Sequence, residues 1–242
     1  MTAALALADY DGFAKRQADS AARGRLRGIG AANPIEVAGG PLRQVKKDIA
    51  RITVRADGCI VIDPGLMSVG QGHETALKRM AQERLQIAAS QIVYRHGDTD
   101  LLTSGRGNGG SAATVVAGAA VSLGLDQLLA EATALAAEIM QSPVSYADGY
   151  FAAESSDTPD TPDTPDAGQT MSWAELLSHS NQLDGLRVDS EFLPDAPTYP
   201  NGCHICEVEI DPKTGRVEIV DYVGVEDVGT VLNRDLVEGQ MQ

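Results

Sequence analysis

The amino-acid sequence predicts an α+β fold, with mixed sheets and packed helices, and three observations lead to this class. Short segments alternate apolar and polar residues, as in "RITVRADGCIVID" (51–63), which is the pattern of half-buried strands. Longer segments repeat apolar residues at helical spacing, as in "HETALKRMAQERL" (73–85). The two kinds of segment do not alternate strictly along the chain, so a doubly wound parallel sheet is not expected.

The first part of the chain predicts one helix, one strand and one hairpin. Residues 3–24 mix alanine and leucine with charged residues, which favours a helix. Residues 27–40 predict a strand-like run that ends in a Gly-Pro turn. Residues 50–65 predict a β-hairpin, because apolar residues alternate on both sides of Asp57-Gly58, a dipeptide that favours tight turns.

The central part begins with a Gly-Gln-Gly turn at residues 70–72, directly before the predicted helix over 73–85. "SQIVYRHGD" (90–98) predicts a strand, and a glycine-rich loop leads from it into a long helix from about Ser111 to Met140. The alanines of this helix allow close packing against other elements.

The last part predicts a second hairpin in "VSYADGYF" (144–151), a short helix over about 173–179 with capping-box spacing at its start, and two paired strands followed by further strand within 206–229. Between the hairpin and the short helix lies a predicted acidic Asp-Thr-Pro surface loop at about 155–170. Proline at every third position excludes a regular helix or ladder there, and we assign this loop no chemistry.

Acidic residues exceed basic ones, 34 against 19, which gives a net charge of -15. Phosphate backbones lack an electrostatic attraction to such a chain, so nucleic acid is not an expected partner. Three cysteines form no even-numbered disulfide framework, and the N-terminal segment lacks the basic region of a signal peptide. The expected location is therefore the cytoplasm. No membrane span is expected, because polar residues interrupt the alanine-rich stretch 112–140.

The segment "GRGNGG" (105–110) matches the G-x-G-x-x-G pattern of dinucleotide-binding sites. Its context argues against that function, because the preceding predicted strand ends near His96, well before the glycines. Two interpretations remain open. Backbone N–H groups and the Ser111 hydroxyl form an anion site at a helix N-terminus, or the glycines simply allow a tightly packed turn. The pattern alone favours the packed turn.

The segment "CHIC" contains the potential zinc ligands Cys203, His204 and Cys206. Strand alternation places Cys203 on the face opposite the other two, and no fourth ligand is evident. Packing of small thiols is therefore preferred over metal ligation. His73, at the start of its predicted helix, is expected to pack or cap, with ligand contact as the alternative. The remaining carboxylates are expected on solvated faces or in turns, and no catalytic-triad spacing is found.

Four segments carry a resemblance to a known family: "RGIGAANPIEVAGG" (27–40), "GQGHETA" (70–76), "HGDTDLLTSGRGNGGS" (96–111) and "NGCHICEVEIDPKTGRVEIVDYVGVEDVGTVLNRDLVEGQ" (201–240). In this order they resemble the molybdopterin-binding large subunit of the xanthine oxidase family, in the branch of aerobic carbon monoxide dehydrogenases and bacterial aldehyde dehydrogenases. The resemblance runs through essentially the whole chain. It implies that residues 1–242 form part of a molybdopterin-binding domain.

The resemblance implies that the cofactor is molybdopterin with molybdenum, in its cytosine dinucleotide form in some members. The implied cofactor-binding residues are Gly70, Gln71, Gly72, Gly110, Ser111 and Gln240. The pterin edge presents alternating donors and acceptors that the Gln71 amide can match, while the neighbouring glycines let the backbone come close. Main-chain and hydroxyl donors at Ser111 would add to this site.

Members of the family oxidatively hydroxylate aldehydes, purine-like heterocycles or carbon monoxide with oxygen from water, and electrons leave through iron-sulfur and FAD subunits. The resemblance therefore implies those subunits, a small-molecule substrate and the remaining parts of the large subunit as partners. In the family pattern the catalytic glutamate lies beyond Gln242, and the loop near molybdenum lies before this chain's first residues. No catalytic residue is therefore expected within the chain.

The sequence departs from the family pattern at Ala112-Ala113, where relatives commonly have an arginine and a hydroxyl residue. Weaker binding of the phosphate or dinucleotide end of the cofactor is expected. Two functions remain in view: the cofactor-binding part of a molybdenum hydroxylase, and a truncated, non-catalytic remnant or interaction module without cofactor. A remnant is expected to expose apolar patches and to associate.

Overall fold

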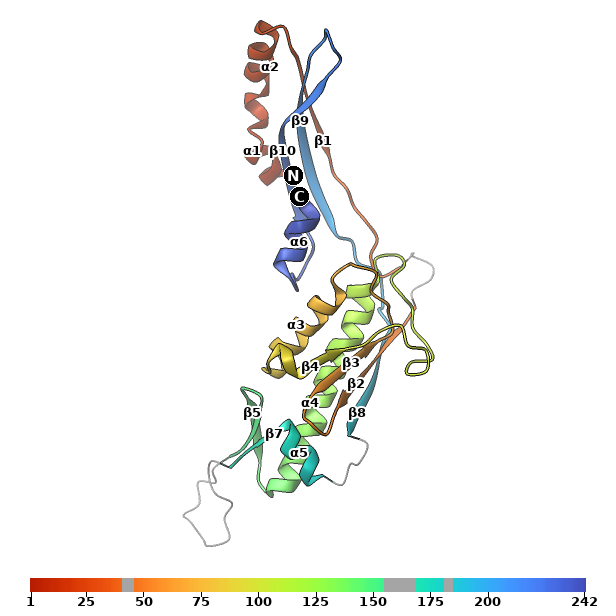
Figure 1. Cartoon of the computed structure of the whole chain (residues 1–242). Helices are drawn as coiled ribbons and strands as arrows, with labels where there is room; N and C mark the ends of the chain where they lie inside the picture. Colours follow the sequence, from red (N-terminus) through yellow and green to blue (C-terminus); the bar gives the residue numbers. More distant parts are fainter. Residues whose placement is uncertain (41–45, 155–168, 181–184) are drawn as a thin grey trace. The chain divides into compact units, whose positions relative to one another are not determined.

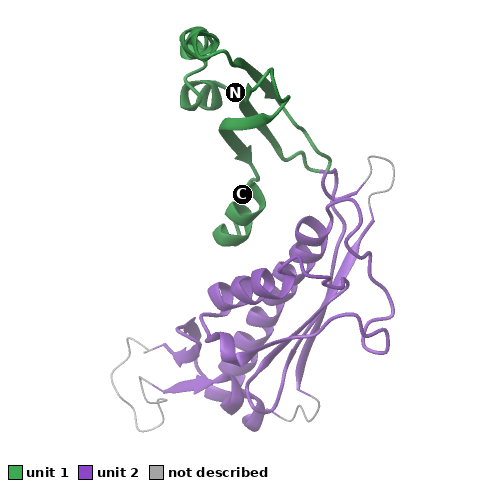
Figure 2. Ribbon diagram, turned by 45° about the horizontal axis from the view of Figure 1, so that its top comes forward, with its two compact units in different colours: residues 1–37, 198–242 green, residues 38–197 purple. Residues whose placement is uncertain are grey.

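The computed structural model describes residues 1–40, 46–154, 169–180 and 185–242, which form two compact units (Figure 2). Unit 1 comprises residues 1–37 and 198–242, and unit 2 comprises residues 38–197. Helices combined with parallel and antiparallel strands confirm the predicted α+β class. The predicted Asp-Thr-Pro repeat lies outside the described residues.

The larger sheet of unit 2 has the strand order β4-β3-β2-β8. Strand β2 (Asp48–Val54) pairs antiparallel with β3 (Ile60–Pro64) and with β8 (Leu186–Phe192). β2 and β3 form the predicted hairpin, in which the Cys59 N–H donates to Asp57 Oδ1 at 3.0 Å. β4 (Ile92–Tyr94) pairs parallel with β3, and helix α3 (His73–Leu85) connects them. β3, α3 and β4 thus form a βαβ unit.

The core of unit 2 lies between this sheet and helix α4 (Ala119–Met140), which contacts β2, β8 and α3 (Figure 1). The helix can come close because Gly124 has no side chain. A Cβ at Gly124 would lie 2.8 Å from Ser190 Oγ and 2.9 Å from Ile52 Cγ1. The Ser190 hydroxyl donates to the Ala120 carbonyl at 2.7 Å and so links β8 to α4.

The long helix begins later than predicted. It starts at Ala113 instead of Ser111, and Ala113–Gly118 form a π-helical segment, η3, before α4. By length and composition alone, Ala113–Met140 could cross a membrane. In the structure this segment packs against the sheet, and the core helix of a folded domain meets the same criteria.

A second, three-stranded antiparallel sheet of unit 2 consists of β5 (Val144–Ala147), β6 (Tyr150–Ala153) and β7 (Thr170–Ser172). β5 and β6 form the predicted hairpin. The predicted capping box is confirmed at α5 (Trp173–His179), where the Ser172 N–H donates to Glu175 Oε2 at 2.8 Å. A short 3-10 helix, η2, covers Ala89–Gln91.

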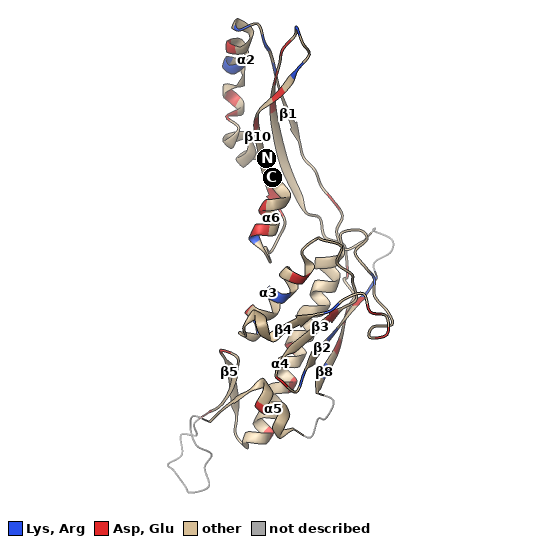
Figure 3. Ribbon diagram, viewed as in Figure 1, with Lys and Arg blue, Asp and Glu red and all other residues tan. Residues whose placement is uncertain are grey.

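Unit 1 is an antiparallel sheet of β1 (Leu26–Ala32), β9 (Asn201–Ile210) and β10 (Val217–Asp227), with β9 in the middle. The register of β9 with β10 confirms the predicted strand pair. Helices α1 (Thr2–Leu7) and α2 (Phe13–Ala22) pack against this sheet, and α6 (Arg234–Met241) follows β10. Acidic and basic positions are scattered over the elements of both units (Figure 3).

Two sequence predictions are wrong in unit 1. The helix predicted over 3–24 is interrupted, because Asp9 adopts a left-handed φ of 43° and a 3-10 helix, η1 (Tyr10–Gly12), follows. The strand predicted to continue to residue 40 ends at Ala32. Pro34 explains this end, since it has no N–H to donate and restricts the residue before it.

Candidate functional site

The carboxyl ends of the parallel strands β3 and β4 form one edge of the sheet in unit 2. The loop after β3 leads through residues 65–72 into α3, and the loop after β4 leads through residues 95–112 into η3 and α4. α3 contacts both η3 and α4, so these helices begin close to one another (Figure 1). This edge of a sheet with parallel strands and crossover helices is where ligands commonly bind.

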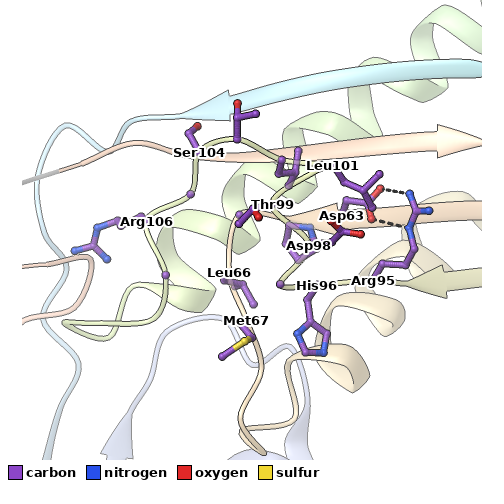
Figure 4. A pocket seen from close by; sticks show the side chains of 17 residues that line it. Asp63, Leu66, Met67, Arg95, His96, Asp98, Thr99, Leu101, Ser104 and Arg106 are labelled. Atoms are coloured by element: carbon purple, nitrogen blue, oxygen red, sulfur yellow. Dashed lines mark hydrogen bonds and ion pairs between the residues drawn. The ribbon is translucent and has the colours of Figure 1, made fainter.

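A pocket of about 410 Å³ lies between the two loops (Figure 4). Its lining includes an ion pair between the exposed Arg95 and the buried Asp63, in which Arg95 Nε and Nη2 donate to the two carboxylate oxygens at 2.8 and 2.7 Å. This hydrogen bonding raises the pKa of the Arg95 guanidinium. The paired geometry fixes the position of Arg95 at the pocket, next to His96.

The first glycine of the "GRGNGG" segment has a packing role. A Cβ on Gly105 would lie 2.2 Å from the carbonyl oxygen of Gly65, and a Cβ on Gly65 would lie 2.1 Å from Asp48 Oδ1. Both positions therefore require glycine, which supports the packed-turn interpretation here. β4 ends at Tyr94, before the motif, so the strand-turn-helix context of a dinucleotide site is not present in this segment.

The predicted site residues Gly110 and Ser111 form a left-handed turn, with φ of 72° and 51°. Their carbonyl oxygens accept hydrogen bonds from the N–H groups of Gly40, at 3.0 Å, and Gly39, at 3.2 Å. The sequence reading missed this clamping role of Gly39 and Gly40. The Gly-Gly pair in the sequence could have indicated it, since glycine is favoured where the backbone has positive φ, and both residues have positive φ in the structure.

The predicted residues Gly70, Gln71 and Gly72 form the entry to α3. Gly70 and Gly72 have positive φ, 107° and 76°, and Gly72 occupies the N-cap position. Since no side chain caps the helix, its first N–H groups face outward with the positive end of the helix dipole. Gln71 is exposed, and its Oε1 accepts from the Val69 N–H at 2.6 Å, which leaves its Nε2 as the donor for a ligand.

Buried polar atoms without a hydrogen-bond partner among the described residues gather at this edge. They are Asp48 Oδ2, His73 Nδ1, Tyr94 Oη, Arg106 Nε and Asn108 Oδ1. Such groups are costly to bury, so a polar ligand or water is expected to complete them. Burial also lowers the pKa of His73 and raises that of Tyr94 to about 12.

Three carboxylates contradict the expectation of solvated faces. Asp48, Asp63 and Glu207 are 1%, 3% and 2% exposed. Strand alternation could have identified Asp48, because it shares the buried face of β2 with Ile52. Its hydrogen bond from the Arg106 N–H at 3.2 Å places this carboxylate beneath the glycine-rich loop.

Gln240 lies in α6 of unit 1, whereas the other five predicted site residues belong to unit 2. In unit 1, Cys203 is buried, and His204 and Cys206 lie on the opposite face of β9 as predicted. His204 Nε2 is hydrogen-bonded to Glu226. The described residues contain no group of three His, Cys, Asp or Glu side chains that could hold a metal ion.

The sequence model of a family described as the molybdopterin cofactor-binding domain matches residues 3–242. The chain belongs to this family. Among its relatives, the nicotine 6-hydroxylase large subunit of Paenarthrobacter nicotinovorans is 29% identical, over 98% of the chain and 30% of the relative. The carbon monoxide dehydrogenase large chain of Afipia carboxidovorans is 29% identical, over 80% of the chain and 24% of the relative.

Solved structures also resemble this chain. The Cu,Mo carbon monoxide dehydrogenase superposes with a TM-score of 0.80 at 26% identity, over 99% of the chain and 32% of the neighbour. The quinoline 2-oxidoreductase of Pseudomonas putida 86 superposes with a TM-score of 0.81 at 26% identity, over the same shares. The resemblance noted in the sequence is therefore confirmed. The chain spans about 30% of the length of its first curated relatives.

Proposed function

We propose that this chain is the cofactor-binding part of a molybdenum hydroxylase. The match of the family model to residues 3–242 carries the proposal. The site suits such a group, because the unpaired atoms of His73, Tyr94 and Asn108 provide donors and acceptors for a pterin, and the uncapped start of α3 suits a phosphate. When bound, molybdopterin with molybdenum supplies the redox centre for hydroxylating a substrate carbon with oxygen from water.

The residues proposed to hold the cofactor are Gly70, Gln71, Gly72, Gly110, Ser111 and Gln240. In this proposal Gln71 keeps its Oε1 on the Val69 N–H and donates from Nε2 to the cofactor. Ser111 is exposed in its left-handed turn and its carbonyl accepts from Gly39, so its backbone N–H and hydroxyl are the donors proposed for the cofactor. These residues bind and orient, and none of them is assigned the role of catalytic base.

The wider assembly also belongs to this proposal. We propose the cytosine dinucleotide form of the cofactor, iron-sulfur and FAD subunits as electron-transfer partners, and an aldehyde, heterocycle or carbon monoxide as substrate, in the cytoplasm. The names of the relatives support a multi-subunit enzyme, since they are large chains or subunits of complexes. Ala112-Ala113 at the end of the turn argue for weaker contacts to the phosphate end.

A non-catalytic interaction module without cofactor is the second candidate. Exposed apolar side chains in unit 1 favour it, among them Leu26, Val217 and Ile219. The two candidates differ in molybdenum and pterin content.

The first test measures molybdenum and pterin in the full chain, purified from a host that makes the cofactor, alone and with the proteins encoded beside it. We expect the cofactor only in the co-produced sample, and a loss of at least about tenfold with Gln71→Glu. This variant keeps an acceptor for the Val69 N–H, and a negative charge at a helix N-terminus is favourable, so its Tm should not fall.

Gln127→Glu is the matched control, because Gln127 is an exposed glutamine on α4. Its cofactor content should equal that of the unchanged chain. Equal content in the Gln71→Glu sample would remove Gln71 from the site. Absence of cofactor from every sample would favour the interaction module.

A further inference from the structure

One face of the unit 1 sheet is covered by α1 and α2, and the opposite face carries apolar residues in cross-strand rows. The rows are Leu26, Ile210 and Val217; Gly28, Val208 and Ile219; and Gly30, Cys206 and Tyr222. We call these nine residues the open face. Leu26, Val217, Ile219 and Tyr222 are 58%, 57%, 67% and 53% exposed. A contiguous exposed apolar patch of this kind is typical of an interaction surface.

Neither backbone conformation nor close packing against the described residues requires glycine at Gly28 and Gly30 of the open face. Gly28 and Gly30 do not adopt positive φ. A Cβ at Gly28 would meet only Val208 Cγ2 at 4.0 Å, and a Cβ at Gly30 would meet nothing within 4 Å. Glycine weakens a strand and often marks the close approach of another backbone or ligand. At Gly28 and Gly30 the backbone of β1 is therefore open to close contact with another polypeptide.

The ion pairs of β9 with α2 and β1 lie on the helix-covered face of the sheet. Glu207 and Glu209 point to the helix-covered face, where they pair with Arg16, Arg23 and Arg27. The nine residues of the open face include no Asp, Glu, Lys or Arg. Beyond the Tyr222 row the same face carries His204, which is hydrogen-bonded to Glu226. The nine residues therefore form an apolar area bordered by this pair, and an apolar polypeptide segment fits that area.

We infer that the open face docks an apolar segment of the large-subunit polypeptide that relatives carry outside the matched region. Such polypeptide exists in the solved neighbours, which superpose on 99% of this chain while the chain covers only 31–32% of them. The inference rests on the proposed function in naming a large subunit as the partner. It does not require bound cofactor.

Two cysteines of β9 provide the measurement. Cys206 lies on the open face, and Cys203 is 2% exposed on the helix-covered face. The full chain is produced in two samples, alone and together with its proposed partner. The partner is the polypeptide from the same genome that matches the flanking parts of the family's large chains. It is supplied as a separate chain or as a continuation of this one. Iodoacetamide labelling is followed by mass spectrometry. We expect Cys206, and not Cys203, to react in the chain alone, and its labelling to slow at least about tenfold in the complex.

The variants are Gly28→Val and Gly30→Val, with Ala31→Val on the other face of the same strand as the matched control. Valine suits a strand, so none of the three should lower the Tm. The two glycine variants should lose the complex, and the control should keep it.

Four results would overturn the inference. They are an intact complex with both glycine variants, unchanged labelling of Cys206 in the complex, absence of any matching polypeptide from the genome, and protection of Cys206 by self-association in sedimentation experiments, which would assign the face to a second copy. Molybdenum content separates the two proposals. A complex without molybdenum would retain the docking surface and reject the cofactor function, whereas molybdenum retained by the glycine variants would retain the function and reject the docking surface.

Discussion

The two units are stabilised in different ways. Unit 2 has an extended apolar core between its sheet and α4, in which Ile52, Leu125 and Leu128 are fully buried. The separate buried apolar cluster of unit 1 consists of Ala4, Ala8, Cys203 and Ile205. Unit 1 adds ion pairs between α2, β1 and β9. We conclude that unit 2 is stabilised by its own core, whereas unit 1 relies on charge pairing and, by our inference, on a partner.

One buried carboxylate from each unit, Glu207 in unit 1 and Asp48 in unit 2, shows a further difference between the units. Burial opposes ionisation of Glu207, but hydrogen bonds from Arg16 and Arg27 outweigh this effect and lower its pKa. Asp48 accepts only two backbone N–H groups through Oδ1, and burial raises its pKa. The pH dependence of stability should therefore have opposite signs at these two positions.

The largest effect is expected in the core of unit 2. Leu125→Ala removes a fully buried side chain and should lower the free energy of unfolding by about 2–5 kcal/mol in urea titrations. Leu123→Ala on the same helix is the control, because Leu123 is 39% exposed and should cost less than about 1 kcal/mol. Equal losses for both leucines would show that α4 is not the core helix of this unit.

The charge pairing of unit 1 gives the next largest effect. Glu207→Gln should cost about 1.5–3 kcal/mol at neutral pH, because charged hydrogen bonds from two arginines are lost. Since the folded-state pKa is lowered, this contribution is present above the unfolded-state pKa and disappears as the pH falls through the folded-state value. Urea titrations at several pH values would show the two chains converging in acid.

Glu218→Gln is the control for this experiment, because Glu218 pairs with Arg216 at the surface. It should change stability by less than about 1 kcal/mol. A difference between Glu207→Gln and the unchanged chain that persists at low pH would mean that packing, and not charge, explains the loss.

Local patterns predicted most of the fold. The hairpin at Asp57-Gly58, the helix behind Gly72 and the capping box at Ser172 each depend on a few neighbouring residues, and all three are confirmed. The interruption at Asp9 was missed, because nothing in the helical composition of its neighbours excludes a continuous helix.

The site was less accessible to sequence reasoning, because it depends on contacts between distant segments. The hydrogen bonds from Gly39 to Ser111 and from Gly40 to Gly110 join residues far apart in the chain. The burial of Asp48 follows from strand alternation, but it also needs Gly65 and Gly105, which allow the two loops to come close together. The binding roles of Gln71 and the other implied residues come from the family resemblance and stay a prediction.

The smallest effect concerns Asp48 and has the opposite sign to that of Glu207. Because burial raises its folded-state pKa, the chain loses stability as the pH rises from the unfolded-state value through the folded-state value. Asp48→Asn keeps an oxygen for the two backbone N–H groups and removes the charge, so it should gain on the order of 1 kcal/mol at neutral pH and nothing in acid. Asp189→Asn, which breaks a pair with Arg51, should instead reduce stability at neutral pH. A loss with Asp48→Asn at neutral pH that disappears in acid would mean that the ionised carboxylate holds the glycine-rich loop, and the contrast between the buried carboxylates of the two units would no longer stand.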